Sequence, residues 1–270
     1  MDSERLDQGV GYIELRHVTE IIKHFNYKKL EDAGIIPILG EKNETKKFPI
    51  WVYREKSFSE YGMFLDYLVR RMILAFNPSK DARGNAKEPA ALILQEKLES
   101  LESDQYFSYV ESLNRYLDSD IPWTSVIYHS YRISSLHYGR EIYTKQEINK
   151  NYMSYQYMAK ELEVRWRYFG LCNPKFNQEY NYKSLTAHPD LIVDIYENEI
   201  CRGKAVIDIK TTHNFSKMKS GAYLQILLYY AILNQLGYQI NCIGILLPLQ
   251  RDIILYNLTD WDYRPFLELI

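Results

Sequence analysis

Two short segments in the last third of the chain concentrate side chains that could do chemistry. The first covers 188–194 and contains Asp190, and the second covers 205–212 and contains Asp208 and Lys210. Carboxylates held close together raise one another's pKa, and burial raises it further. A divalent cation removes that cost, and oxygen ligands of this kind suit Mg²⁺ or Mn²⁺. A lysine beside such an ion can hold or polarise a water molecule.

A β-hairpin would bring these side chains together. Both segments are rich in β-branched and apolar residues, and turn formers lie between them. If the turn centres near 199–200, antiparallel pairing places Asp190 opposite the level of Asp208 and Lys210. Because side chains alternate along a strand, Asp208 and Lys210 then share one face.

A helix is predicted over 221–236, stopped by Gly237. It is apolar on most sides, which predicts a buried position. Gln225 and Tyr229 lie one turn apart and therefore share a face. A buried glutamine requires a hydrogen-bond partner, and the alternative to a functional role is an ordinary core glutamine bonded to backbone.

Three motifs occur in the order strand, strand and helix: Pro189-Asp190, Asp208-x-Lys210 and Gln225-x-x-x-Tyr229. Together they resemble the PD-(D/E)XK nuclease superfamily, and the helical motif resembles its RecB-type branch. The resemblance covers about the last third of the chain. It implies that Gln225 and Tyr229 face the metal site and bind the substrate backbone.

The same resemblance implies a role for each residue of the hairpin. Asp190 and Asp208 would bind the metal, and the Ile209 carbonyl would be a further ligand. Lys210 would orient or activate the attacking water. The implied fold is α/β, a restriction-endonuclease-like core in which a small mixed sheet is flanked by helices.

An earlier helix, predicted over 57–75, carries Gly62-x-x-x-Asp66. This is similar to the Gly-x-x-x-His of RecB-type nucleases, with a carboxylate in the place of the histidine. Asp66 would then complete the metal shell, since Mg²⁺ prefers oxygen ligands. The alternative is a solvated carboxylate that pairs with Arg70 one turn later.

His137 and His188 compete with Asp66 for that position. His188 precedes Asp190 by two residues and could share its strand face. His137 precedes its nearest glycine, whereas the motif places the glycine first. Distance separates the candidates, because a carboxylate more than about 8 Å from Asp190 and Asp208 is too far to bind the same ion.

Length and composition are consistent with one continuous globular domain over 1–270. The part over 1–185 is predicted to be largely helical and to carry the first motif, and 186–270 to carry the hairpin and the closing strands. No apolar run approaches the roughly 18 to 20 residues of a membrane span. The first residues lack the pattern of a signal peptide, so we expect a soluble intracellular protein with no membrane partner.

Charge and cysteine content limit the function further. A net charge of −2 argues against a protein that simply coats nucleic acid, although a local basic groove can coexist with it. Cys172, Cys201 and Cys242 are odd in number and widely spaced, which predicts reduced thiols. They fall short of the four cysteines of an iron–sulfur site, so no such cluster is expected.

The remaining elements follow from apolar periodicity. Further helices are predicted over 12–31, 90–101, 104–117 and 144–169, strands over 240–247 and 252–256, and an exposed loop over 77–89. Five lysines form either a solvated face or a phosphate-contacting loop: Lys28, Lys29, Lys42, Lys46 and Lys47. Tyrosines alternate with cations over 128–160, where they could stack on bases, but a place in the core is favoured.

The predicted function is metal-dependent hydrolysis of phosphodiester bonds in DNA. One or two Mg²⁺ or Mn²⁺ ions would hold the scissile phosphate, in an exonuclease or a structure-dependent endonuclease of replication, repair or recombination. An RNA endonuclease with the same site is the alternative within enzymes. A non-catalytic nucleic-acid-binding scaffold is the alternative outside them, and the sequence does not identify any protein partners.

Overall fold

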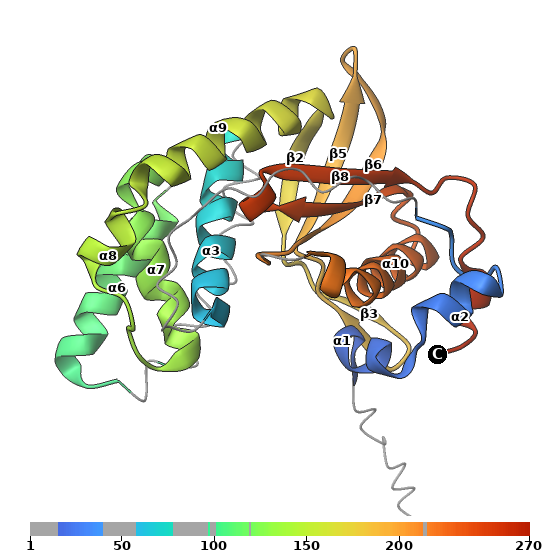
Figure 1. Cartoon of the computed structure of the whole chain (residues 1–270), viewed down its shortest axis with the longest axis horizontal. Helices are drawn as coiled ribbons and strands as arrows, with labels where there is room; N and C mark the ends of the chain where they lie inside the picture. Colours follow the sequence, from blue (N-terminus) through green and yellow to red (C-terminus); the bar gives the residue numbers. More distant parts are fainter. Residues whose placement is uncertain (1–15, 40–57, 78–96, 98–100, 119, 213–214) are drawn as a thin grey trace, which may run out of the picture.

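The computed structural model describes residues 16–39, 58–77, 97, 101–118, 120–212 and 215–270. The chain is α/β, with mixed sheets flanked by helices, as predicted (Figure 1). Five helices gather on one side of the main sheet: α3 (Phe58–Phe76), α6 (Ser103–Leu117), α7 (Ile127–Ser135), α8 (Lys145–Asn149) and α9 (Tyr152–Tyr168). None of the described helices is both long and apolar enough to cross a lipid bilayer.

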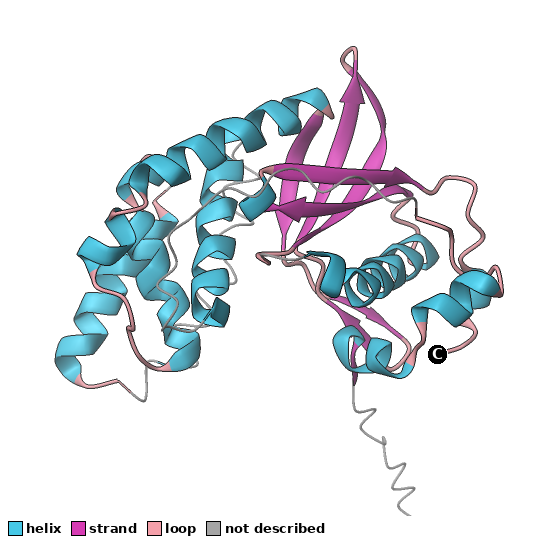
Figure 2. Ribbon diagram, viewed as in Figure 1, coloured by secondary structure: helices cyan, strands magenta, loops and turns pink. Residues whose placement is uncertain are grey.

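The main sheet has five strands in the order β2-β5-β6-β7-β8 (Figure 2). Their bounds are β2 Leu171–Phe176, β5 Leu191–Glu197, β6 Ile200–Ile209, β7 Ile240–Leu247 and β8 Asp252–Asn257. Strands β6 and β7 are parallel and every other neighbouring pair is antiparallel. The predicted hairpin is confirmed, since β5 and β6 join through Asn198 and Glu199, both with positive φ as in a tight hairpin turn.

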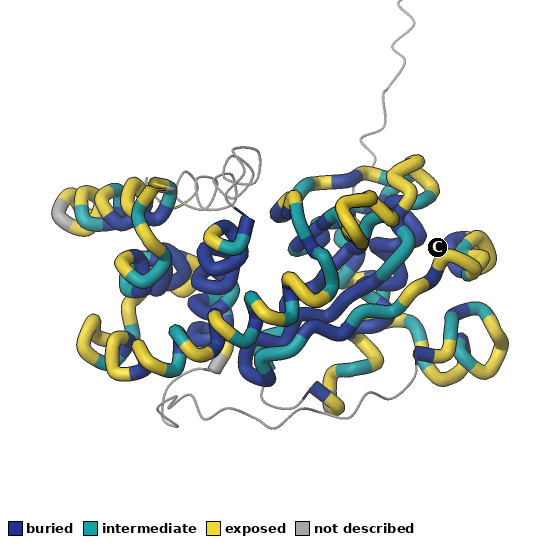
Figure 3. Tube along the Cα trace, turned by 90° about the horizontal axis from the view of Figure 1, so that it is seen from above, coloured by how far each residue is buried: buried dark blue, intermediate teal, exposed yellow. Residues whose placement is uncertain are grey.

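Side chains of the hairpin alternate between two cores. Ile192 and Val206 pack with helix α10 (Lys219–Gln235), whereas Leu191 and Ile207 pack with α3 and α9. In Figure 3 the strands that cross the middle of the molecule are mostly buried. Helix α10 connects β6 to β7 and lies against both strands. Two parallel strands need such a crossover, because a tight turn cannot join them.

The first predicted helix, over 12–31, is wrong within the described residues. A short strand β1 (Arg16–His17) precedes helix α1 (Val18–Ile21), the 3₁₀ turn Ile22–His24 and helix α2 (Tyr27–Asp32). Asn26 causes the break, because its extended backbone lets its side chain accept the N–H of Lys29 and cap α2.

The long helix predicted over 144–169 is divided into α8 and α9. Thr144 and Glu147 form a capping box at the start of α8. Asn151 lies between the two helices, and its buried amide donates to the hydroxyl of Tyr61, ninety residues earlier. This tertiary hydrogen bond holds the turn, and periodicity within the segment does not reveal it.

Several elements had no prediction, namely α7, β2, β3 (Tyr180–Tyr182) and β4 (Leu185–Ala187); the last two form a second sheet with β1. The predicted α3, α6, α10, β7 and β8 are present to within two residues. Most of the predicted loop over 77–89 and helix over 90–101 lies outside the described residues, as do Lys42, Lys46 and Lys47. Lys28 pairs with Glu31 and Asp32 on an exposed surface.

The tyrosines over 128–160 divide between the core and the surface. Tyr131, Tyr143 and Tyr155 are buried and pack edge to face on Tyr61 or Phe64. Tyr138, Tyr152 and Tyr157 are exposed. The core interpretation therefore holds for the first group, whose rings form the packing between α3 and the helices around it.

Candidate functional site

The ends of the hairpin strands bring two carboxyl groups together. Leu191 pairs with Ile207, and one residue beyond that pair lie Asp190 and Asp208. A side-chain hydrogen bond joins the two carboxyl groups. Asp190 Oδ2 also accepts the backbone N–H of Ile209 at 2.7 Å, which fixes its orientation. The hairpin thus holds both carboxyl groups at one end of the sheet.

Asp208 is the most deeply buried of these charges, at 2% exposure. Burial raises the pKa of Asp208 to about 8, a shift that Lys210 opposes and Asp190 increases. In the metal-free protein the carboxyl group therefore binds a proton more readily than an exposed aspartate does. A buried acid with a raised pKa is a typical feature of a functional site.

Lys210 connects the strand end to helix α10. Its Nζ lies 2.7 Å from Asp208 Oδ2 and donates to Gln225 Oε1 at 3.1 Å. The Gln225 amide in turn donates to the Tyr229 hydroxyl at 2.9 Å. That hydroxyl also bonds to the backbone of His188. Tyr229 is buried, so the chain of contacts orients Gln225, and Gln225 orients the ammonium group.

Helix α3 approaches this end of the sheet at Gly62. A Cβ atom there would meet Thr211 Oγ1 at 2.7 Å, so an added side chain would require either the Thr211 side chain or the helix to shift. One turn later, Asp66 Oδ2 accepts from Arg70 Nε at 3.0 Å and lies 2.7 Å from Arg70 Nη2. Gly62 therefore sets the depth at which Asp66 and Arg70 enter the site.

Arg70 joins Asp66 to the hairpin. Its Nη2 lies 3.6 Å from Asp190 Oδ1, so one nitrogen contacts both carboxylates. Their oxygens are no farther apart than the sum of the two contacts, below the limit of about 8 Å for a common ion. Asp66 contacts the site through the guanidinium group, however, and not by a direct contact with Asp190.

The charges of the carboxylate cluster, which we define as Asp66, Arg70, Asp190, Asp208 and Lys210, are strongly coupled. Burial raises the pKa of Asp66, and Arg70 offsets part of that shift. Burial lowers the pKa of Lys210, but Asp208 and Asp190 raise it above its ordinary value. Three carboxyl groups thus share two permanent cations.

The other candidate ligands contact different groups. His188 Nε2 lies 3.7 Å from Glu179 Oε2, and its ring stacks on His17 with centroids 5.3 Å apart. His137 lies in the helical part, where its Nε2 is 3.2 Å from the hydroxyl of Tyr67. Ile209 is buried at the end of β6, between Asp208 and Lys210. Among these residues, Ile209 alone has a described hydrogen bond to an aspartate of the cluster.

The donor chemistry fits a hard divalent cation. Mg²⁺ in enzymes is commonly bound by one or two carboxylates, with water and substrate phosphate completing its shell. Asp190 and Asp208 supply such a pair, and the ammonium group of Lys210 lies 2.7 Å from the buried Asp208 Oδ2. The residues that the structure describes contain no group of three or more His, Cys, Asp or Glu side chains arranged to hold an ion. The fit is therefore to a two-carboxylate site.

Sequence reasoning missed Arg70 and Thr211 as parts of this site. The spacing of Asp66 and Arg70 indicated their pairing, but not the contact of Arg70 with Asp190 across the sheet end. Thr211 follows the Asp-x-Lys motif directly, and its contact with Gly62 gives no sequence signal. Cys172, Cys201 and Cys242 are free thiols.

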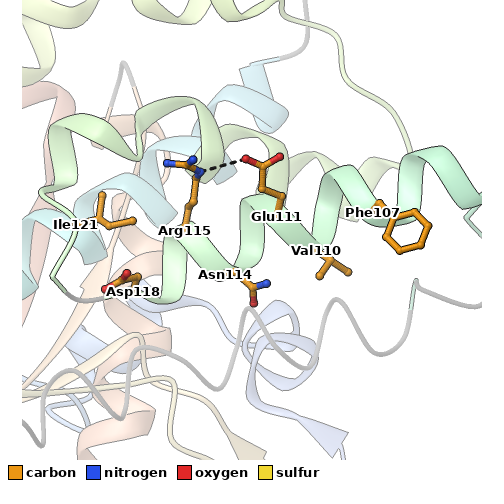
Figure 4. Close-up of a pocket in the computed structure, with 7 residues that line it drawn as sticks. All are labelled: Phe107, Val110, Glu111, Asn114, Arg115, Asp118 and Ile121. Carbon is orange, nitrogen blue, oxygen red and sulfur yellow. Dashed lines mark hydrogen bonds and ion pairs between the residues drawn. The ribbon is translucent and has the colours of Figure 1, made fainter.

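A shallow surface pocket lies elsewhere, along helix α6 (Figure 4). Its lining residues share one helix face and the following turn: Phe107, Val110, Glu111, Asn114, Arg115, Asp118 and Ile121. Glu111 and Arg115 pair with each other across its rim. The pocket shares no residue with the carboxylate cluster, and its only charged groups are exposed ones on that helix and turn.

No family model, curated protein or solved structure matches this chain. Its function is therefore argued from its own residues.

Proposed function

We propose that the chain is a metal-dependent nuclease that hydrolyses phosphodiester bonds in DNA. One observation carries the proposal: two aspartates and a lysine from the hairpin meet a glutamine from α10 in one connected group of contacts. The order of strands and the α10 crossover are compatible with a restriction-endonuclease-like core of the PD-(D/E)XK type. The buried, coupled charges support a catalytic site, because a binding module has no need of paired carboxylates facing phosphates.

Each residue then has a role that its contacts support. Asp190 and Asp208 would hold Mg²⁺ or Mn²⁺, whose chemistry is to neutralise the phosphate and acidify a bound water. Lys210 would orient the attacking water from its position beside Asp208. Gln225 and Tyr229 keep Lys210 in place, and the partly exposed Gln225 could also contact the substrate backbone.

A second candidate is a nucleic-acid-binding scaffold without catalysis. It is favoured by the ion pairs of the cluster, since Arg70 and Lys210 already neutralise carboxylates that a metal would use. An RNA endonuclease would use the same residues as the DNA enzyme. The three functions differ in their products, so one assay separates them.

The test is a digestion assay with labelled single-stranded DNA, duplex DNA, flapped DNA and RNA. Each substrate is incubated with the protein in Mg²⁺, in Mn²⁺ and in chelator, beside the Lys210→Ala variant as a control for contaminating nucleases. We expect cleavage of DNA that requires metal and Lys210. Cleavage of RNA alone would favour the ribonuclease, and binding without cleavage in either metal would favour the scaffold.

A further inference from the structure

The guanidinium group of Arg70 lies where a cation binding Asp190 must compete with it. Arg70 is 6% exposed and touches Asp66 and Asp190 through the same nitrogen, Nη2. Burial lowers the pKa of Arg70, but Asp66 and Asp190 more than offset this, so the group stays cationic. The guanidinium group of Arg70 therefore places a positive charge beside Asp190, the carboxylate that a metal would bind.

Arg70 also has an unused donor. Its Nη1 is buried and has no hydrogen-bond acceptor among the residues that the structure describes. Buried polar groups in native proteins are nearly always satisfied, and an exception requires an explanation. A guanidinium group presents its donors as a planar fork that suits two oxygens of a phosphate. Within the described part of the chain this donor is therefore available to an anionic ligand.

We propose that Arg70 is a displaceable counter-ion that becomes a phosphate-binding group. Before metal binds, Arg70 holds Asp190 to Asp66; once a divalent cation occupies Asp190, the guanidinium group binds a phosphate of the substrate. This inference rests on the proposed nuclease function and adds a residue to its site. Arg70 stays anchored to Asp66 in both states, since Nε and Nη2 both contact Asp66 Oδ2.

This role has a consequence that a purely structural role does not have. Two cations that share one carboxylate repel each other, so Arg70 weakens metal binding while it assists the reaction. Neutral replacement should therefore change metal affinity and cleavage in opposite directions. A residue that merely positions Asp190 would weaken both when it is replaced.

The experiment is calorimetric titration of Mn²⁺ into the full chain, with cleavage rates measured at saturating Mn²⁺. Arg70→Gln and Arg70→Met remove the charge, with and without a hydrogen-bonding end, and either one that folds is sufficient. We expect Mn²⁺ to bind roughly three- to tenfold more tightly. Cleavage should fall by about 100-fold, a typical loss for a group that stabilises transition-state charge.

Two controls accompany these variants. Arg71→Gln alters the neighbouring buried arginine of α3, which donates to the backbone carbonyls of Asp118 and Ile121. It should lower stability and leave Mn²⁺ affinity unchanged. Arg70→Lys keeps the charge and loses the fork, so Mn²⁺ affinity should stay near that of the unaltered protein while cleavage falls.

Each of the other possible outcomes would overturn one named part of the proposal. Unchanged or weaker Mn²⁺ binding by folded Arg70→Gln would overturn the competition, and tighter binding with unchanged cleavage would overturn the phosphate contact. An unaltered protein that binds Mn²⁺ but cleaves nothing would overturn the proposed function while the titrations still test the competition. An unaltered protein that neither binds Mn²⁺ nor cleaves would overturn both.

Discussion

Two arginine–carboxylate networks in different parts of the molecule differ in how completely their groups are satisfied. In the helical part, Arg132 Nε donates to Glu141, and Arg132 Nη1 donates to the backbone and hydroxyl of Ser108 and to Ser112. The second oxygen of Glu141 accepts from Tyr128 at 2.8 Å. One cation faces one carboxylate there, and these donors and acceptors are matched.

The carboxylate cluster shows the opposite arrangement. Asp66, Asp190 and Asp208 outnumber the two cations, and the buried Nη1 of Arg70 lacks a hydrogen-bond acceptor among the described residues. Matched groups serve stability, whereas unmatched buried groups cost stability and persist where they serve a function. The difference supports the proposed site in the carboxylate cluster and a structural role for the Arg132 network.

The largest expected effect tests this assignment through activity. Asp208→Asn and Lys210→Ala should each reduce cleavage at least about 100-fold, since in the proposed mechanism each removes a group that acts on the reacting atoms. Calorimetry separates their roles: Asp208→Asn should weaken Mn²⁺ binding, and Lys210→Ala should leave it largely intact. Glu141→Gln, from the matched network, is the control and should cleave normally. Full activity in Lys210→Ala would remove the basis of the proposed mechanism.

The hairpin and α10 could be predicted because their signals are local. Runs of β-branched and apolar residues on either side of the turn formers predicted β5 and β6, and a sequence that is apolar on most sides predicted the buried helix. The pairing of Asp66 with Arg70 followed from helical spacing. For these elements the residues that decide the structure are neighbours in sequence.

Other features depend on contacts between distant segments. The break at Asn151 depends on Tyr61, and the depth of α3 depends on Thr211, more than a hundred residues from Gly62. Strand β2 depends on pairing with β5, and its short sequence contains a proline. The contact of Arg70 with Asp190 also joins distant segments. The sequence therefore predicted the pair of Arg70 and Asp66, whereas in the structure Arg70 bridges Asp66 and Asp190.

The second prediction compares the stability of variants in the two networks. Arg132→Ala should destabilise the protein by roughly 1–3 kcal/mol, because it leaves a part-buried carboxylate and its other partners unsatisfied. Asp208→Asn should be neutral or stabilising without metal, because it replaces a buried acid whose pKa is raised. Urea denaturation in chelator measures both. A large loss of stability in Asp208→Asn would show that the carboxylate cluster stabilises the fold as the Arg132 network does.

The third prediction concerns pH. Burial raises the pKa of Asp208 from its ordinary value of 3.8 to about 8, so the folded metal-free protein binds a proton that the unfolded chain has lost in this range. Stability in chelator should therefore fall as pH rises from about 5 to 8. Thermal unfolding should show a decrease of a few degrees that Asp208→Asn removes. Saturating Mn²⁺ should also remove it, since the metal replaces the proton.

The smallest expected effect concerns how Asp66 contributes to the site, and a double-mutant cycle on Mn²⁺ affinity resolves it. If Asp66 is itself a ligand, Asp66→Asn weakens Mn²⁺ binding by the same factor whether residue 70 is Arg or Gln. If Asp66 acts by holding Arg70 away from Asp190, the weakening disappears once the guanidinium group is removed. The contacts of 2.7 and 3.6 Å from Arg70 Nη2 favour the second result, because the cation lies between the carboxylates. We therefore expect a roughly three- to tenfold loss in the first background and almost none in Arg70→Gln, since the effect is carried by one charge moving closer to the ion.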